Sequence, residues 1–297
     1  LDVNMGKLKM TTGKKVMCGI PLVMSVLICT LVVLSEQTAA AGDKTDNNTL
    51  TIRNIRLTHP SDEIIFGWNI NDIAEKNIDR TGNEDISDTL NAALMKIFEN
   101  GGGSLYLPAG KYRIDKPIFI PAGTALRGDF VKPVIGPIDT TRNTILCAYY
   151  GRGMHGNDTA LITIDGSSLL DGIVIWYPEQ QVKSIVSYAP TVRHSDRFAQ
   201  WAINGASRNI YLVNAFIGIQ FGNKGQGTCI QLAKNIYGTP LSKGIEVWQD
   251  ADIPRIIEVD FRPDFWPASG LDRSPADIKT VSQYLFKKAS GIVFHRS

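Results

Sequence analysis

The feature that most constrains the fold is the stretch 101–128, where short apolar runs are cut by Pro-Ala-Gly corners or by single glycines. Apolar side chains alternate within these runs, as at Leu105 and Leu107 and again at Ile118 and Ile120, so one face of each run points inward. Runs this short do not bury themselves as hairpins. They fit a chain that bends repeatedly in the same sense and stacks each bend on the one before.

An internal repeat supports the same architecture. The tripeptide Asn-Ile-Tyr occurs at 209–211 and again at 235–237, and Gly-Ile occurs at 218–219 and again at 244–245. Both offsets are 26 residues, and a shared offset at two separate points is typical of stacked coils in a solenoid. Neighbouring coils then lie about 4.8 Å apart, the ordinary spacing of paired strands. The sequence therefore predicts an all-β fold, a single-stranded parallel β-helix.

A helix is expected immediately before the first short runs. Residues 84–100 carry the apolar pattern of an amphipathic helix, with Leu90 and Leu94 on one face. Asp85 is the expected N-cap, and the glycines at 101–103 end the helix. The first coil of an open β-helix has an unpaired edge, which invites aggregation. We therefore expect an N-terminal α-helix that caps this end of the β-helix.

These motifs resemble a known family. An acidic-Thr helix, then Gly-Gly-Gly, Pro-Ala-Gly-x-Tyr and Ile-Pro-x-Gly-x-x-Leu-Arg-Gly, resembles the opening of the pectate-lyase-like, right-handed parallel β-helix superfamily. The likeness is closest to the branch of glycosyl hydrolase family 28-related and rhamnogalacturonase/epimerase-like proteins. Further matches at 176–180, 237–241 and 264–266 extend it over roughly 80–297. One departure is Ser87, where the family has the first Asp of Asp-Asp-Thr.

The resemblance implies a secreted carbohydrate-active enzyme, a hydrolase or a lyase, with pectin-like or related polysaccharide as its partner. A lyase of this superfamily uses Arg or Lys as its base and often needs carboxylates that hold Ca²⁺, so Ca²⁺ is the one cofactor that the resemblance suggests. The Asn-x-Asp, Asp-Asp and Arg-x-Lys motifs of family 28 hydrolases are not found together in the sequence, because Asp-Asp and Arg-x-Lys are missing. The alternative is therefore a non-catalytic β-helix that binds glycan or serves as a surface or adhesion module.

The N-terminal residues have the order of a secretory signal. Lys14 and Lys15 precede an apolar run at 16–34, and three alanines at 39–41 come before polar residues. We expect 1–41 to be a signal peptide that is removed from an extracellular or periplasmic protein.

A permanent membrane anchor is the alternative, since about twenty apolar residues can cross a bilayer. Pro21 and the alanines favour cleavage, after which no stable membrane anchor remains. Met10 or Met5 is the natural start, so the residues before it are expected to be spurious.

Two further segments follow. We expect 42–80 to form an N-terminal arm or leading strand, and 81–297 to form the β-helix domain. The last predicted strand, 291–294, has no cap after it. We therefore expect the domain to be truncated at its C-terminus, with catalytic residues beyond it, and the protein to be a monomer or an oligomer through the β-helix faces.

Charge and cysteine content exclude several classes. The net charge of +2 is near zero and no run of basic residues suited to nucleic acid stands out in the sequence, so we expect no nucleic-acid partner. Cys147 and Cys229 lie in apolar contexts and read as ordinary buried thiols. No HExxH, CxxC or GxSxG motif is present.

The densest polar and aromatic cluster lies at 246–266. Strand alternation predicts that Glu246 and Trp248 point outward, and that Glu258 points outward together with Asp260 and Arg262. Two carboxylates on neighbouring coils lie at the roughly 5–9.5 Å that glycoside hydrolysis uses. Indole rings stack on sugar rings. We expect the catalytic residues among Glu258, Asp260, Glu246 and Arg262, and the substrate-binding residues among Trp248, Asp250, Asp252, Asp264, Trp266 and Trp176.

Overall fold

The computed structural model describes residues 53–55, 65–195, 201–272 and 277–295. The predicted signal peptide, 1–41, lies outside the described residues. No helix within the described part of the chain is long and apolar enough to cross a membrane. The described residues belong to one compact unit, Leu50–Ser297.

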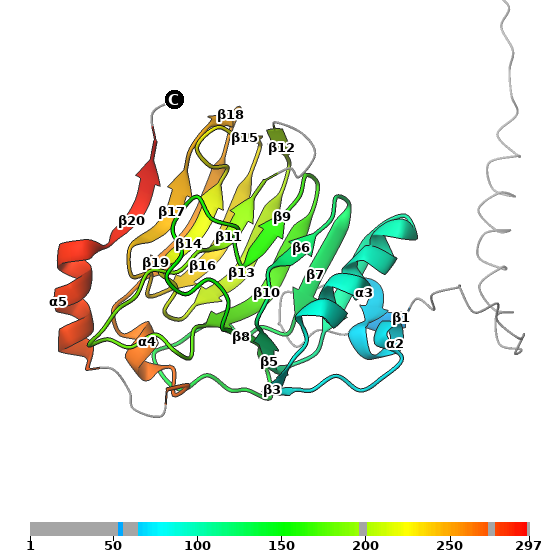
Figure 1. Cartoon of the computed structure of the whole chain (residues 1–297), viewed down its shortest axis with the longest axis horizontal. Helices are drawn as coiled ribbons and strands as arrows, with labels where there is room; N and C mark the ends of the chain where they lie inside the picture. The colour runs from blue at the N-terminus through cyan, green and yellow to red at the C-terminus, as the bar shows by residue number, and fades with distance from the viewer. Residues whose placement is uncertain (1–52, 56–64, 196–200, 273–276, 296–297) are drawn as a thin grey trace, which may run out of the picture. The chain divides into compact units, whose positions relative to one another are not determined.

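The described strands form three sheets of eleven, six and three strands (Figure 1). Sheet 1 contains β1 (Arg53–Ile55), β2 (Ile65–Asn69), β3 (Thr81–Asp85), β4 (Gly103–Leu107), β5 (Gly110–Ile114), β7 (Thr124–Gly128), β8 (Thr144–Ala148), β10 (Leu169–Trp176), β13 (Ala206–Leu212), β16 (Leu232–Gly238) and β19 (Arg255–Phe261). Sheet 2 contains β6 (Ile118–Ile120), β9 (Ile162–Ile164), β11 (Pro190–His194), β14 (Ile217–Phe221), β17 (Lys243–Val247) and β20 (Ser290–Phe294). Sheet 3 contains β12 (Trp201–Ile203), β15 (Gly227–Cys229) and β18 (Asp250–Ala251).

The chain winds as a parallel β-helix, as predicted. Ile210 pairs with Ile236 in parallel strands, and Ile219 pairs with Ile245 in the same way, so the 26-residue repeat is the repeat of the coil. All strand pairs in the three sheets are parallel except the hairpin of β1 and β2.

The long strands of sheet 1 bend at one equivalent position in each coil. Gly172, Asn209, Asn235 and Glu258 all have a positive φ, between 52° and 73°. We call the residues before this bend the first half of sheet 1 and those after it the second half; β7 pairs with the first half of β10, and β8 with its second half. A left-handed residue resets the alternation of side chains, and so both Ile257 and Glu258 are exposed. Glu258 is exposed as alternation predicts, but Ile257, which strict alternation would turn inward, is exposed as well.

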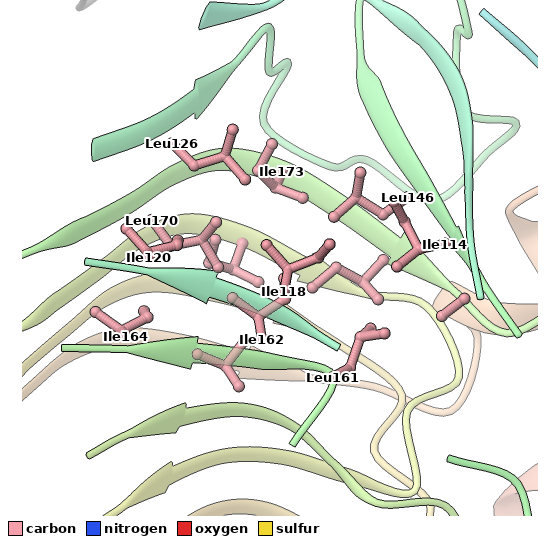
Figure 2. Close-up of a cluster of buried hydrophobic side chains, with 14 of the residues drawn as sticks. Ile114, Ile118, Ile120, Leu126, Leu146, Leu161, Ile162, Ile164, Leu170 and Ile173 are labelled. Carbon is pink, nitrogen blue, oxygen red and sulfur yellow. The ribbon is translucent and has the colours of Figure 1, made fainter. Parts of the chain in front are cut away.

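The first two coils bury their inward residues in one apolar core. Figure 2 shows Ile118 and Ile120 of β6 above Ile162 and Ile164 of β9, with Leu126, Leu170 and Ile173 of sheet 1 facing them. All of these side chains are at most 1% exposed. We call this interior the bore and the opposite faces of the sheets their outer faces.

The predicted helix is present as α3 (Ser87–Glu99), after a short α2 (Ile70–Ala74). Leu90, Leu94 and Ile97 are fully buried in the core that the strands share, and α3 packs beside β4, β6 and β7 (Figure 1). Asp85 accepts a hydrogen bond from the backbone N–H of Ser87 at 3.0 Å, although the N-cap position itself is Ile86. The capping role of the helix stays a prediction.

The segments after β19 cover part of sheet 1. They include α4 (Phe265–Ala268) and α5 (Ile278–Lys288). Phe265, Trp266 and Val281 form a second apolar cluster with Tyr211 and Tyr237, which lie on the outer face of the second half. The C-terminal part of the chain therefore folds back against the coils, and this face is not free.

The interval 176–206 differs from expectation. Its composition suggests a loop that leaves the coil, but it contains β11 and β12. β11 pairs on both sides, with β9 and β14, and so is an ordinary strand of sheet 2.

Candidate functional site

A row of polar side chains crosses the outer face of sheet 2. Arg193 on β11 pairs with Gln220 on β14, which pairs with Glu246 on β17. Their neighbours Val192, Ile219 and Ile245 point into the bore. Although the row faces outward, its three side chains are at most 5% exposed. A charged pair shielded from water in this way interacts more strongly than the same pair at the surface.

Glu246 is the centre of this row. Its Oε2 accepts a hydrogen bond from Gln220 Nε2 at 2.6 Å, and its Oε1 lies 2.6 Å from His295 Nε2. The Lys243 ammonium also donates to Oε1. Burial by itself would raise the pKa of Glu246, but the hydrogen bonds from Lys243, Gln220 and His295 outweigh it and hold the pKa below its ordinary value. Glu246 is therefore an ionised carboxylate.

His295, directly after β20, is oriented by two contacts. Besides its bond to Glu246, its ring stacks on the indole of Trp248, with centroids 3.7 Å apart and planes 8° apart. Because the anionic oxygen of Glu246 accepts hydrogen bonds, Nε2 of the neutral imidazole carries the hydrogen. The lone pair then lies on Nδ1, which has no hydrogen-bond partner among the described residues. A carboxylate that orients a histidine in this way leaves the other nitrogen available as a base.

Arg193 joins the row to the loop 151–159. Its Nε donates to Gln220 Oε1 at 2.9 Å, and its Nη2 donates to the carbonyl of Gly156 at 2.6 Å. Gln220 Nε2 donates to the same carbonyl at 3.1 Å. Burial lowers the pKa of Arg193, while the charges of Glu246 and Asp158 oppose that shift. The loop thus covers one end of the row, and Glu246 and His295 lie at the other.

Of the predicted site residues, Glu246 and Trp248 come together here. The predicted outward direction is right for Glu246, but the side chain is buried against three donors. Trp248 is half-buried, with its face against His295.

Glu258, Asp260 and Arg262 lie elsewhere, on or just after β19 of sheet 1. Glu258 sits in the left-handed bend, and Arg262 Nε is 3.0 Å from Asp260 Oδ1. The predicted catalytic residues Glu258 and Asp260 are therefore on a different sheet from the row of Glu246.

Asp250 lies on β18 of sheet 3, and Asp252 follows that strand. Asp250 accepts from Thr228 Oγ1 at 2.9 Å, and Asp252 accepts from Cys229 Sγ at 3.1 Å. Burial raises the pKa of Asp250. The hydrogen bond to Asp252 raises the pKa of the Cys229 thiol. Cys229 is half-buried, whereas the sequence suggested a buried thiol.

The two other predicted indoles hold the C-terminal segment. Trp266 is 1% exposed, so the expectation that it stacks on a sugar is wrong. Its Nε1 donates a hydrogen bond to Asp272. Nε1 of the half-buried Trp176 donates to the same carboxylate, at 2.9 Å. Asp264 precedes α4 without capping it.

His194 lies on β11 before Ser195 and Asp196, but it points into the bore and is fully buried. Its Nδ1 lies 2.6 Å from Gln231 Oε1, and its Nε2 lies 2.8 Å from Ser207 Oγ. Burial lowers its pKa to about 4. This histidine is part of the core, and Asp196 lies outside the described residues.

Sequence reasoning missed His295, Lys243, Gln220 and Arg193. One signal for His295 is in the sequence, because Gly244–Trp248 and Gly291–His295 align as successive coils and place Trp248 beside His295. The burial of the row has no such signal, since it depends on the loop 151–159.

No group of three or more His, Cys, Asp or Glu side chains that could hold a metal ion occurs among the described residues. Ca²⁺ takes six to eight oxygen ligands. Both oxygens of Glu246 already face N–H donors, so the cluster does not fit this ion.

Comparisons with known proteins agree with the resemblance. Residues 69–143 match the family described as "Rhamnogalacturonase A/epimerase, pectate lyase-like". No curated protein matches the chain. Among solved structures, a Parabacteroides merdae protein provisionally assigned as a glycosyl hydrolase is 12% identical, with a TM-score of 0.41, and the match covers 76% of this chain and 95% of that one.

Two other solved structures also match part of this chain at low sequence identity. The A-module of the Azotobacter vinelandii mannuronan C-5 epimerase AlgE4 is 14% identical, with a TM-score of 0.27; the match covers 65% of this chain and 58% of the module. The catalytic unit of a Streptomyces thermodiastaticus GH87 α-1,3-glucanase is 13% identical, with a TM-score of 0.30; the match covers 65% of this chain and 40% of the other.

Proposed function

We propose that this protein is a secreted carbohydrate-active enzyme that cleaves a uronate-containing, pectin-like polysaccharide by β-elimination at the cluster of Glu246, Lys243 and His295. The family match supports a carbohydrate-active protein, and the chemistry of the cluster supports the reaction. The observation that carries the proposal is the contact between Nε2 of His295 and the ionised, buried carboxylate of Glu246, 2.6 Å apart.

In this mechanism His295 is the base. Nδ1 takes the proton from the carbon next to the uronate carboxyl group, and the electrons of that C–H bond form a C=C bond as the glycosidic C–O bond breaks. The leaving oxygen takes a proton from water. Negative charge develops on the uronate carboxylate, and we assign its stabilisation to the ammonium of Lys243, which pairs with Glu246. Glu246 orients the imidazole and stabilises its charged form.

Hydrolysis fits this cluster less well. A hydrolase needs a second carboxyl group as a general acid with a raised pKa. Glu246 has a lowered pKa, and Glu258 and Asp260 lie on sheet 1.

The test is incubation of the full chain with polygalacturonate, rhamnogalacturonan and a neutral β-glucan. We expect unsaturated uronides from an acidic polymer, detected by their absorbance, and no product from the glucan. His295→Ala and Glu246→Gln should each lower turnover by at least roughly a hundredfold, as loss of a general base does. Glu258→Gln is the matched control and should be fully active.

Other outcomes would replace the proposal. Reducing ends without unsaturated products would identify a hydrolase. Binding of glycan without any product would favour the non-catalytic module, which is consistent with the fully satisfied hydrogen bonds of Glu246, since buried ion pairs also serve structural roles.

Secretion is tested separately. Expression of the chain in a secreting host should release a protein whose N-terminal residue lies just after the alanines at 39–41. Retention of the intact N-terminus in the membrane fraction would contradict secretion.

A further inference from the structure

A second row of charged side chains crosses the outer face of the first half of sheet 1. Arg127 on β7 pairs with Asp171 on β10, and the row continues through Arg208 on β13 to Lys234 on β16. Arg255 lies two residues earlier on β19, beside Leu232. Neighbouring strands are about 4.8 Å apart, so the cations of β13, β16 and β19 lie on three successive strands. We call it the basic stripe.

The first part of the stripe is held rigidly. Asp171 is 2% exposed, and its Oδ2 lies 2.9 Å from Arg127 Nη2 and 2.7 Å from Arg208 Nη2. Its Oδ1 accepts from Asn209 Nδ2 at 2.8 Å. One buried carboxylate thus fixes two guanidinium groups, and the Arg208 side chain remains 38% exposed. Guanidinium groups fixed in this way present N–H donors to an anion without a further loss of side-chain entropy.

The second part of the stripe has no compensating charge. Lys234 and Arg255 make no ion pair with any described residue, and Arg255 is exposed. The nearest acidic group along β19 is Glu258, which follows Ile257 at the end of the row. The stripe therefore carries net positive charge in a protein whose net charge is only +2.

The surroundings of the stripe indicate the class of ligand. The adjacent outer row consists of small or aliphatic residues, Ala125, Leu169, Ala206 and Leu232, all half-buried. No tryptophan or phenylalanine lies in these two described rows, and the Tyr106 hydroxyl is committed to Asp129 at 2.7 Å. Proteins that bind single-stranded nucleic acid stack successive bases on aromatic rings, and the two described rows hold only one such ring, that of Tyr106.

We propose that the basic stripe is a second binding surface, separate from the cluster of Glu246, for an anionic polysaccharide with regularly spaced carboxylates. The polymer runs along the coil axis, its carboxylates meeting Arg208, Lys234 and Arg255 on successive strands. The weakly polar row beside the stripe accommodates the sugar rings. This proposal does not depend on catalysis, because the stripe lies on sheet 1 and the proposed active site on sheet 2.

The experiment measures binding of polygalacturonate at low and at high salt, with the fully methyl-esterified polymer as the uncharged ligand of the same backbone. The full chain carrying His295→Ala is used so that turnover does not consume the ligand. The test variant adds Lys234→Gln and Arg255→Gln, which leave the buried Asp171 contacts intact. The control variant adds Lys279→Gln and Lys287→Gln, two exposed lysines of α5.

We expect the test variant to bind polygalacturonate about tenfold more weakly and the control to bind as before, since each exposed charge contributes a modest electrostatic term. High salt should weaken binding, and the esterified polymer should bind poorly. Equal binding by both variants, or no binding of polygalacturonate at low salt, would overturn the proposal. So would tighter binding of single-stranded DNA through the same two residues, which would assign the stripe to nucleic acid.

The two proposals fail separately. Salt-sensitive binding through Lys234 and Arg255 without any cleavage by the wild-type chain would retain the stripe and reject the enzyme. Cleavage that depends on His295, together with unchanged binding by the test variant, would retain the enzyme and reject the stripe.

Discussion

Asn235 donates a hydrogen bond from its Nδ2 to Oδ1 of Asn209, 2.8 Å away and one coil below. Asn209 in turn donates to Asp171, so the bends of three successive coils are linked. Both asparagines have a positive φ, 57° and 52°, a conformation that asparagine tolerates better than most residues. In the next coil Glu258 occupies the bend, and Oδ1 of Asn235 is buried without a partner among the described residues.

Glu258→Asn should therefore stabilise the protein. The new amide can donate to Oδ1 of Asn235, and asparagine suits the left-handed backbone, so we expect a gain of about 1 kcal/mol in the free energy of unfolding. Denaturant titration measures it. Glu258→Gln, which supplies an amide without the left-handed preference, is the control and should gain less. A loss of stability in Glu258→Asn would contradict the proposed continuation of the ladder.

Glu246→Gln should destabilise the fold as well as remove activity. The substitution leaves the charge of the half-buried Lys243 beside a buried neutral amide, and breaking a buried pair costs about 3 kcal/mol. The double variant Glu246→Gln, Lys243→Met should recover part of that loss, because no unpaired charge remains. Thermal and denaturant unfolding of the single and double variants test this. Equal stability of the single variant and the wild type would show that Glu246 is not an ion-pair partner in solution.

Stability should fall as the pH is lowered from 6.5 to about 4 because of His194. Its pKa is about 4 in the fold and 6.5 ordinarily, so in this window the unfolded chain binds a proton that the folded chain does not. The contribution is fully present above pH 6.5, and about 3 kcal/mol of it is lost by pH 4. His194→Gln should flatten the slope between pH 7 and 5, where carboxylates contribute little. An unchanged slope in that variant would assign the effect to other groups.

Ile230→Asn should raise stability by about 1 kcal/mol. Ile230 has a φ of 57° and is 40% exposed, a costly conformation for a β-branched side chain. Asn204, in the neighbouring coil, adopts a φ of 60°. Ile203→Asn is the control, because Ile203 is an exposed isoleucine in a regular strand, and it should give no gain. A gain in the control alone would mean that lost apolar exposure, not relief of strain, decides the effect.

The coiled architecture could be predicted from the sequence because the patterns that indicate it are short and recur along the chain. The offset between Ile210 and Ile236 is the register of two paired strands, and the alternation around Ile245 gives the inner and outer faces correctly. α3 was also predictable, since its buried face follows the helical period. These features depend only on positions near one another in the chain.

The parts of the site that were missed depend on distant contacts. Arg193 and Gln220 are buried because Gly156, in a loop between other strands, lies over them. Trp266 is buried because the segment after β19 folds back, which no spacing reveals. Ile257 departs from alternation because the left-handed bend at Glu258 resets it, and only the alignment of Glu258 with Asn209 and Asn235 could have indicated that.

The stacked bends also bear on how such a chain can change length. The coils of Asp171, Asn209 and Asn235 are tied together through asparagine amides and the parallel strand pairs, and the coil from Asn209 to Asn235 contains a complete set of these ties. A tandem duplication in the gene that copied one such unit would insert a turn whose interior already matches those above and below it. The face open to a polymer would become longer by one strand spacing, and its existing geometry would be preserved. The insertion of a single amino acid would instead disrupt both the strand register and the asparagine contacts.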